Sequence, residues 1–282
     1  MKYVNIQIKV ALLMAIIIVF APTIINADEN EWTSNGPEGG TVYSIAVNPE
    51  NPNNLFIGTI GSHKVAFMPR HSRNHTILPH LINYRANVWS MKSVGVERVI
   101  SPCAAGSLQK HVKPGDFVIC DQFVDWTDGR KSTFFEGPIV THPSPADLYC
   151  PELRELSIKK ANELGITVHD TGTVIVINGP RFSTKAESKF FTNQGWEVIN
   201  MSAFPENYLV KEMDMCPLNI SLITDYDAGL VGDVPPVSHH DVMQVFNSNL
   251  ENLKKLLFSL IESIPAERTV CDCAYTKKNS QL

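Results

Sequence analysis

Residues 68–108 read MPRHSRNHTILPHLINYRANVWSMKSVGVERVISPCAAGSL, and this stretch decides how the rest of the chain is interpreted. It starts with cations, led by Arg70 and His71, continues through a helical pattern, and ends in an apolar strand followed by small residues at 104–107. A small-residue turn after a strand exposes backbone N–H groups where open α/β sheets bind ligands. The guanidinium of Arg offers a planar set of donors that matches phosphate. The stretch therefore predicts an anion site, although a lone Arg-His pair is more often a solvated loop.

The composition is that of an ordinary globular protein. Of the 282 residues, 44% are hydrophobic and 19% are charged, so the chain can form one large α/β domain or two small ones. The net charge of −5 argues against general binding of nucleic acid, which needs clustered Lys and Arg. The six cysteines show no CxxC spacing, so we expect no zinc or other metal site. Cys271 and Cys273 are interpreted as free thiols in a frayed tail, with a redox clip as the alternative.

The N-terminal part of the chain differs in character from the remainder. Two lysines precede an apolar run over residues 10–21, and Ala27 could end a cleavage site. Residues 1–27 are therefore interpreted as a secretory signal peptide, or else as a membrane anchor. Residues 28–54 combine turn clusters with two short strand patterns and resemble the start of one blade in secreted β-propellers of the sortilin type. Because a propeller needs several blades to bury its core, this single copy is interpreted as a foreign β-repeat fragment.

From residue 55 onward, strand patterns alternate with helix patterns. Strands are predicted over residues 64–68, 98–101, 117–120, 174–177, 198–201 and 218–224. Helices are predicted over residues 82–93, 152–164, 185–194, 208–214 and 241–264. The alternation predicts a three-layer α/β sandwich with its active groups at strand ends and in connecting loops, followed by a flexible tail over residues 266–282.

Polar clusters come after several of these strands. Asp225 and Asp227 lie two residues apart directly after a buried strand, where they could act as an acid and as a partner for a nitrogen-rich ligand. Such a pair is more often a turn or a helix cap. Phe182, in a turn after another strand, could stack on a flat ring or serve only in packing. A further cluster spans residues 200–202.

Several long motifs occur together in one order: PRHSRNH, INYRANVW, CAAGSL, PGDFVICDQFVDWT, NGPRFSTKAES, VINMSAFPE and LITDYDAG. With these motifs, residues 55–265 resemble the purine nucleoside phosphorylase family, above all its methylthioadenosine phosphorylase branch. The resemblance implies an α/β/α sandwich with a mixed central sheet, a homotrimer, and small-molecule substrates. It also implies a reaction without cofactor or metal, in which inorganic phosphate is the co-substrate and purine salvage is the role.

The implied reaction is reversible phosphorolysis, in which phosphate displaces the purine from C1′ of the sugar. An oxocarbenium-like transition state requires an anion near C1′ and neutralisation of the charge that grows on the purine. By the resemblance, Met201 lies against the ribose and Phe182 lines the base. Asp225 carries a proton or hydrogen bond to N7, and Asp227 lies by the 6-substituent. Phosphate is held by Arg70, His71, Ser202 and the amides around Cys103 and Ala104.

Three positions bear on substrate choice. A 6-amino group is a donor and needs an acceptor. By the resemblance, this chain has Asp225 at the position where the 6-oxopurine enzymes carry Asn. It has Ser183 where those enzymes carry Glu, so both positions favour 6-aminopurines, with inosine-type substrates as the alternative. His239 matches the His with which 6-oxopurine enzymes meet a 5′-hydroxyl, so adenosine could be accepted as well; a helix-start His is the other interpretation.

The sequence departs from the family before residue 55, where we find no Gly-rich phosphate turn and expect the first strand to be missing. A gene fusion or an assembly chimera would explain a join over residues 55–60. Losing a strand and a loop would leave sheet edges unpaired and remove phosphate donors, so we expect reduced phosphate affinity. Ser72 replaces the usual Gly and strains the loop if its φ is positive.

These departures leave open a second class of function, a catalytically impaired, exported module that binds or supports other molecules. The signal-like segment points outside the cell, whereas the resemblance points to the cytoplasm. Once that segment is removed, we expect no membrane contact.

Overall fold

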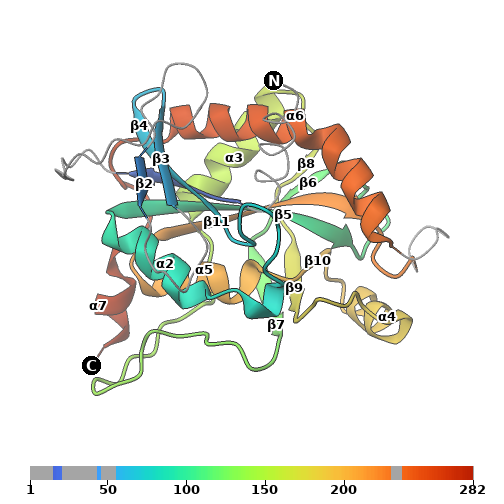
Figure 1. The fold of residues 1–282 in the computed structure, drawn as a ribbon, viewed down its shortest axis with the longest axis horizontal. Helices are drawn as coiled ribbons and strands as arrows, with labels where there is room; N and C mark the ends of the chain where they lie inside the picture. Colours follow the sequence, from blue (N-terminus) through green and yellow to red (C-terminus); the bar gives the residue numbers. More distant parts are fainter. Residues whose placement is uncertain (1–14, 21–42, 46–54, 230–236, 282) are drawn as a thin grey trace.

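The computed structural model describes residues 15–20, 43–45, 55–229 and 237–281. These form a curled mixed sheet with helices on both faces (Figure 1). The three-layer α/β/α sandwich predicted from the alternation of strands and helices is confirmed. No helix in the described part of the chain combines the length and apolarity that crossing a bilayer needs.

The central strand is β5 (Val96–Ser107), which pairs with β1, β10 and β11. Along the main path the sheet has the order β2 (Tyr43–Ile45), β3 (Leu55–Ile60), β4 (His63–Pro69), β1 (Ala15–Phe20), β5, β10 (Val198–Asn200), β9 (Thr173–Ile177) and β7 (Gln122–Trp126). A branch from β5 carries β11 (Cys216–Asp225), β6 (Phe117–Ile119) and β8 (Val168–His169). Pairing of β5 with β11 and of β10 with β9 is parallel, and the N-terminal strands pair antiparallel.

Strand β1 comes from the apolar run that was expected to belong to an export signal. Its backbone pairs antiparallel with β4 and with β5, so Ile17 has Phe67 on one side and Ile100 on the other. A continuous run of β-branched apolar residues is typical of such an interior strand. Strand β1 therefore occupies the position of the strand that we expected to be missing, and that expectation is wrong. Strand β2, from the propeller-like stretch, extends the same sheet. The rest of both N-terminal segments and the proposed cleavage site lie outside the described residues.

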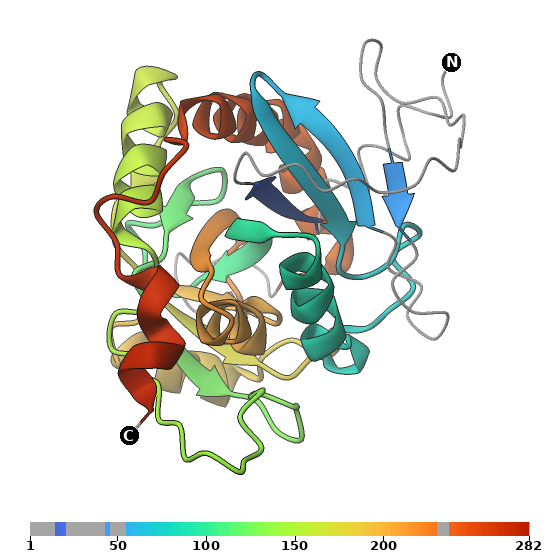
Figure 2. The same ribbon diagram turned by 90° about the vertical axis from the view of Figure 1, so that its left-hand side faces the viewer.

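Two pairs of helices cover the sheet (Figures 1 and 2). Helices α3 (Pro151–Glu163) and α6 (His239–Ser263) pack on one face, where α6 contributes leucines that are at most 1% exposed at positions 250, 253, 257 and 260. Spacings of three and four residues place these side chains on one helix face, and each buried Leu contributes about 1.5–3 kcal/mol. Helices α2 (Tyr84–Ser93) and α5 (Ala203–Glu212) pack on the other face. Helix α4 (Lys185–Asn193) begins with a capping box between Thr184 and Glu187.

The C-terminal residues differ from the flexible tail that we expected. They contain a 3₁₀ turn, η2 (Cys273–Tyr275), and a short helix, α7 (Thr276–Ser280). Cys273 is fully buried, and Gln281 forms a β-bridge with Thr141. The segment is held because its cysteine side chains pack into the core beside α3 and β11.

Candidate functional site

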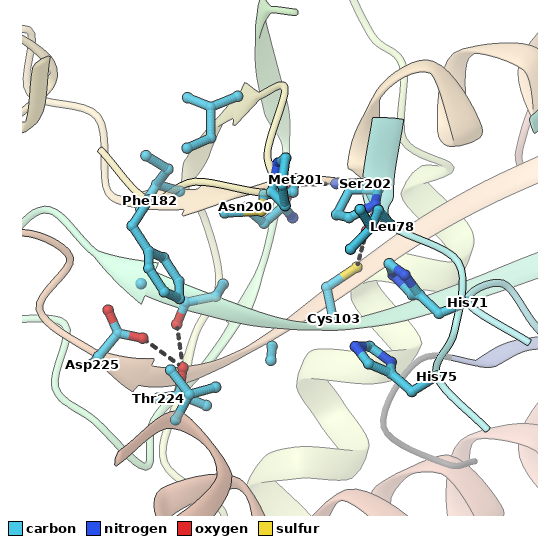
Figure 3. Close-up of a pocket in the computed structure, with 18 of the residues that line it drawn as sticks. His71, His75, Leu78, Cys103, Phe182, Asn200, Met201, Ser202, Thr224 and Asp225 are labelled. Carbon is cyan, nitrogen blue, oxygen red and sulfur yellow. Dashed lines mark hydrogen bonds between the residues drawn. The ribbon is translucent and has the colours of Figure 1, made fainter. Parts of the chain in front are cut away.

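A cavity of about 390 Å³ lies where β4, β5, β10 and β11 end or bend (Figure 3). Nine of the eleven side chains proposed from the sequence line it: Arg70, His71, Cys103, Ala104, Phe182, Met201, Ser202, Asp225 and Asp227. Ser183 lies beside Asp227, and the side chain of His239 is outside the described parts of the structure. In Figure 3, His71 and His75 lie on one side of the cavity, and Asp225 and Phe182 on the other.

Arg70 comes directly after β4 and is 1% exposed. Its Nε and Nη2 atoms donate to the two carboxylate oxygens of Glu206, each at 2.8 Å, and its Nη1 donates to the carbonyl of Pro102 at 3.0 Å. Burial opposes the charged form of Arg70, but the carboxylate of Glu206 outweighs this and raises the pKa above its ordinary value. The sequence motif pointed to Arg70, whereas it offered no signal that Glu206, on α5, would orient it.

His71 is neutral rather than cationic, because burial and then the charge of Arg70 lower its pKa to about 3. Its Nδ1 donates to the carbonyl of Ile77 at 2.7 Å, which leaves Nε2 as an acceptor. The ring centroid of His75 lies 4.9 Å from that of His71. Our expectation that this loop presents several cations therefore needs correction, since in the folded protein the imidazole of His71 is an uncharged acceptor.

Ser72 meets the condition for strain, because its φ is +68°. Its hydroxyl lies 2.7 Å from Oγ1 of Thr76 and accepts the backbone N–H of Thr76 at 3.2 Å. The left-handed backbone disfavours any residue with a Cβ, and these contacts offset part of the cost.

The small residues at 104–107 do not form the turn that we predicted. They continue β5, and Ala104 and Ala105 pair in parallel with Leu222 and Ile223 of β11, so no turn-type nest of amides is present there. Their small size serves close packing instead. A Cβ added to Gly106 would lie 2.9 Å from Oδ1 of Asp225 and 3.0 Å from Cγ2 of Ile199.

Ser202 precedes α5 and lines the cavity, but Phe204 has non-helical dihedral angles (φ −115°, ψ 138°), so the regular part of the helix begins after it. The side chain of Asn200 accepts the backbone N–H groups of Ser202 and Ala203 at 3.3 and 3.2 Å. Its own Nδ2 is buried and lacks a hydrogen-bond partner among the described residues. The Sγ of Cys103 lies 3.6 Å from the hydroxyl of Ser202, and burial raises the pKa of this thiol, which keeps it neutral. Because Asn200 already accepts both backbone N–H groups, the donor that Ser202 offers to an anion is its hydroxyl.

The opposite side of the cavity carries two carboxylates. Asp225 accepts the hydroxyl of Thr224 at 2.7 Å and the backbone N–H of Asp227 at 2.8 Å. Burial raises the pKa of Asp227, which the hydroxyls of Ser188 and then Ser183 oppose. One oxygen of Asp227, Oδ2, is buried and has no hydrogen-bond partner among the described residues. This side of the cavity therefore offers acceptors to a ligand that carries N–H groups.

Arg130 holds the walls of the cavity together, a role that the sequence did not suggest. Its guanidinium lies over the ring of Tyr84, 5.3 Å from the centroid, and donates to the carbonyls of Met201 and Asn178, each at 2.9 Å. Arg130 stands in the loop after β7, in a stretch of Asp, Gly and Lys that predicts only an exposed turn.

Residues 42–262 match the family described as the phosphorylase superfamily. The chain is 53% identical over 220 residues to the S-methyl-5'-thioadenosine phosphorylase of Thermofilum pendens, covering 78% of this chain and 82% of that protein. It is 50% identical over 218 residues to the enzyme of the same name from Pyrococcus abyssi, covering 77% and 83%. The solved methylthioadenosine phosphorylase from Schistosoma mansoni in complex with adenine superposes with a TM-score of 0.79 at 30% identity, covering 86% of this chain and 92% of that one.

Proposed function

The chain belongs to the phosphorylase superfamily, and from this premise we propose that it cleaves methylthioadenosine with phosphate, giving adenine and 5-methylthioribose-1-phosphate. The reaction makes it a pentosyltransferase. The observation that carries the proposal is a single cavity with Arg70, His71 and Ser202 at one side and the carboxylates of Asp225 and Asp227 at the other.

At the first side, the residues suit a phosphate that approaches C1′ of the sugar. Arg70 is a permanent cation whose plane is set by Glu206, and Ser202 adds a hydroxyl donor. The neutral His71 can accept a hydrogen bond from a protonated phosphate oxygen through Nε2. The neutral thiol of Cys103 and the small side chain of Ala104 add no negative charge that would repel the anion.

At the second side, the carboxylates suit a departing adenine. Negative charge grows on the purine as the glycosidic bond breaks, and Asp225 in its protonated form can donate its proton or a hydrogen bond to N7, which leaves a carboxylate at Asp225 and neutralises the departing base. The buried Oδ2 of Asp227 offers an acceptor for the 6-amino group. Phe182 and Met201 also line the cavity, and we expect Phe182 to contact the base and Met201 the sugar. Removing any of these groups should destabilise the transition state more than the bound substrate and should therefore lower the rate of cleavage.

The preference for a 6-aminopurine rests on the carboxyl groups of Asp225 and Asp227 and on Ser183. Ser183 places a hydroxyl rather than a carboxylate beside Asp227. We propose His239 as the residue that decides between a 5′-hydroxyl and a methylthio group. The homotrimer and the absence of a redox or organic cofactor are carried over from the family resemblance.

The test is a substrate panel. Purified protein is incubated with methylthioadenosine, adenosine or inosine, with and without phosphate, and the released base is quantified. We expect adenine from methylthioadenosine when phosphate is present, less from adenosine, and least hypoxanthine from inosine. Asp225→Asn should lower adenine release, whereas Asp147→Asn, a change at an exposed aspartate, should not. Release of hypoxanthine as the fastest reaction would refute the assignment.

A further inference from the structure

Four cysteines from distant parts of the sequence meet at one point of the fold. Cys150 precedes α3, Cys216 begins β11, and Cys271 and Cys273 belong to the C-terminal segment, which passes beside α3 (Figure 2). Their Sγ atoms all lie within 4.8 Å of one another, and three of the four residues are buried. None of the four lines the cavity in the described part of the chain.

The spacing of the sulfurs is close to that of a metal site. Four thiolates at about 2.3 Å from a tetrahedral zinc ion are separated by about 3.8 Å. Cys216 and Cys271 are already at 3.6 Å, and even the longest separation exceeds the tetrahedral value by only about 1 Å. Four thiols without an ion gain little from one another, because sulfur is a weak donor and a weak acceptor. A soft cation makes use of all four.

Positive charge surrounds the cluster. Nζ of Lys211, whose side chain is 9% exposed, lies 3.5 Å from the Sγ of Cys273 and 3.4 Å from Asp272. Arg268, which lies 3.6 Å from the carboxylate of Glu97, also interacts electrostatically with Cys216. A divalent ion with four thiolates has a net charge of −2, and these two cations, each of which also faces a carboxylate, offset part of it. Asp272 already gives the nearly buried ammonium of Lys211 one anionic partner, and a thiolate at Cys273 would give it a second.

We propose that Cys150, Cys216, Cys271 and Cys273 form a four-thiolate site for a divalent d¹⁰ cation, zinc in the cell. The ion fastens the C-terminal segment to α3 and β11 and therefore has a structural role. Our expectation of no metal rested on the absence of CxxC pairs, and sequence spacing cannot reveal ligands that tertiary structure brings together. The segment also packs against α5, whose other end carries Ser202 and Glu206, so the ion supports the phosphate side of the cavity from a distance.

The test is the metal content of the full chain, purified without chelator and under conditions that keep thiols reduced. We expect one zinc per chain by elemental analysis, and release of that zinc when the thiols are titrated with a mercurial. Replacement by Co²⁺ should give the intense visible bands of tetrahedral cobalt–thiolate coordination. A chelator that removes the ion should lower the thermal midpoint, and added zinc should restore it.

Two variants make the result specific. Cys271→Ser changes the ligand that is partly exposed, so the protein should still fold, and its zinc affinity should fall at least about tenfold. Cys120→Ser, at a buried cysteine outside the cluster, should keep a full complement of zinc. The proposal would be overturned if wild-type protein were isolated without metal and its thermal midpoint did not change when zinc was added. It would also be overturned by an intact mass four hydrogens below that of the reduced chain, because that result would show two disulfides in place of the site.

Discussion

Replacing Gly106 by alanine tests how tightly the cavity is built around Asp225. The added Cβ would lie 2.9 Å from Oδ1 of Asp225, 3.0 Å from Cγ2 of Ile199 and 3.4 Å from the backbone nitrogen of Asp227. Ordinary contacts begin at about 3.5 Å, so the carboxylate would have to retreat by about 0.5 Å or more. A reacting group displaced on the order of 1 Å loses about 10²-fold in rate, so we expect kcat/KM for methylthioadenosine to fall about 10- to 100-fold. Overpacking should also lower the free energy of unfolding by about 1–3 kcal/mol.

The measurements are initial rates of adenine release and urea unfolding, with Gly58→Ala as the matched control. An added Cβ at Gly58, in β3, meets no described atom within 4 Å, so that variant should keep wild-type kcat/KM. If Gly106→Ala acts through Asp225, it should cost much less in an Asp225→Asn background, which a double-mutant cycle measures. Gly106→Ala with wild-type kcat/KM and unchanged unfolding would refute the reasoning. Equal losses in the two backgrounds would show that the effect does not pass through Asp225.

Three further predictions concern the loop after β4. Glu206→Gln leaves Arg70 with an uncompensated buried charge, so urea unfolding should show a loss of about 3–5 kcal/mol and the KM for phosphate should rise. The pKa of His71 is lowered on folding from 6.5 to about 3, so its contribution to stability is complete above 6.5 and is lost as the pH falls toward 3. Unfolding free energies measured across that window should fall by at most about 1.4 kcal/mol per pH unit, and His71→Asn should flatten the slope. The free energy of unfolding should be about 1 kcal/mol higher for Ser72→Gly than for Ser72→Ala. Both variants lose the hydroxyl, but only alanine keeps a Cβ at a positive φ.

Each of these has a contrary result. A Glu206→Gln protein as stable as wild type would mean that Arg70 finds another partner. A stability curve unchanged by His71→Asn between pH 6.5 and 3 would show that folding does not lower the pKa of this imidazole. Equal stability of the two Ser72 variants would remove the argument for backbone strain.

Much of the cavity could be predicted from the sequence, because polar residues placed directly after apolar strands meet at one edge of a sheet. Arg70, Ser202 and Asp225 stand at the ends of three different strands and line one cavity. The helices and strands after residue 55 could be predicted for a related reason, since hydrophobic periodicity and caps such as Thr184 are local. Even so, the small residues at the end of β5 predict a turn where the strand in fact continues, because composition cannot distinguish conformational freedom from close packing.

The features that could not be predicted depend on contacts between distant segments. Glu206 accepts hydrogen bonds from Arg70 and fixes its orientation. Arg130 lies in a loop that has the composition of an exposed turn, yet it donates to the carbonyl of Met201. The four-cysteine cluster joins residues that no spacing rule connects. Strand β1 has the composition of an export signal as well as that of an interior strand, and only its pairing with β4 and β5 distinguishes the two.

The most direct test of the central claim is the identity of the sugar product. With methylthioadenosine and inorganic phosphate, mass spectrometry or phosphorus NMR should show one 5-methylthioribose-1-phosphate for each adenine released, and adenine release should stop when phosphate is withheld. Adenine accompanied by free 5-methylthioribose, at a rate independent of phosphate, would contradict the account, because water rather than a bound anion would then be the nucleophile.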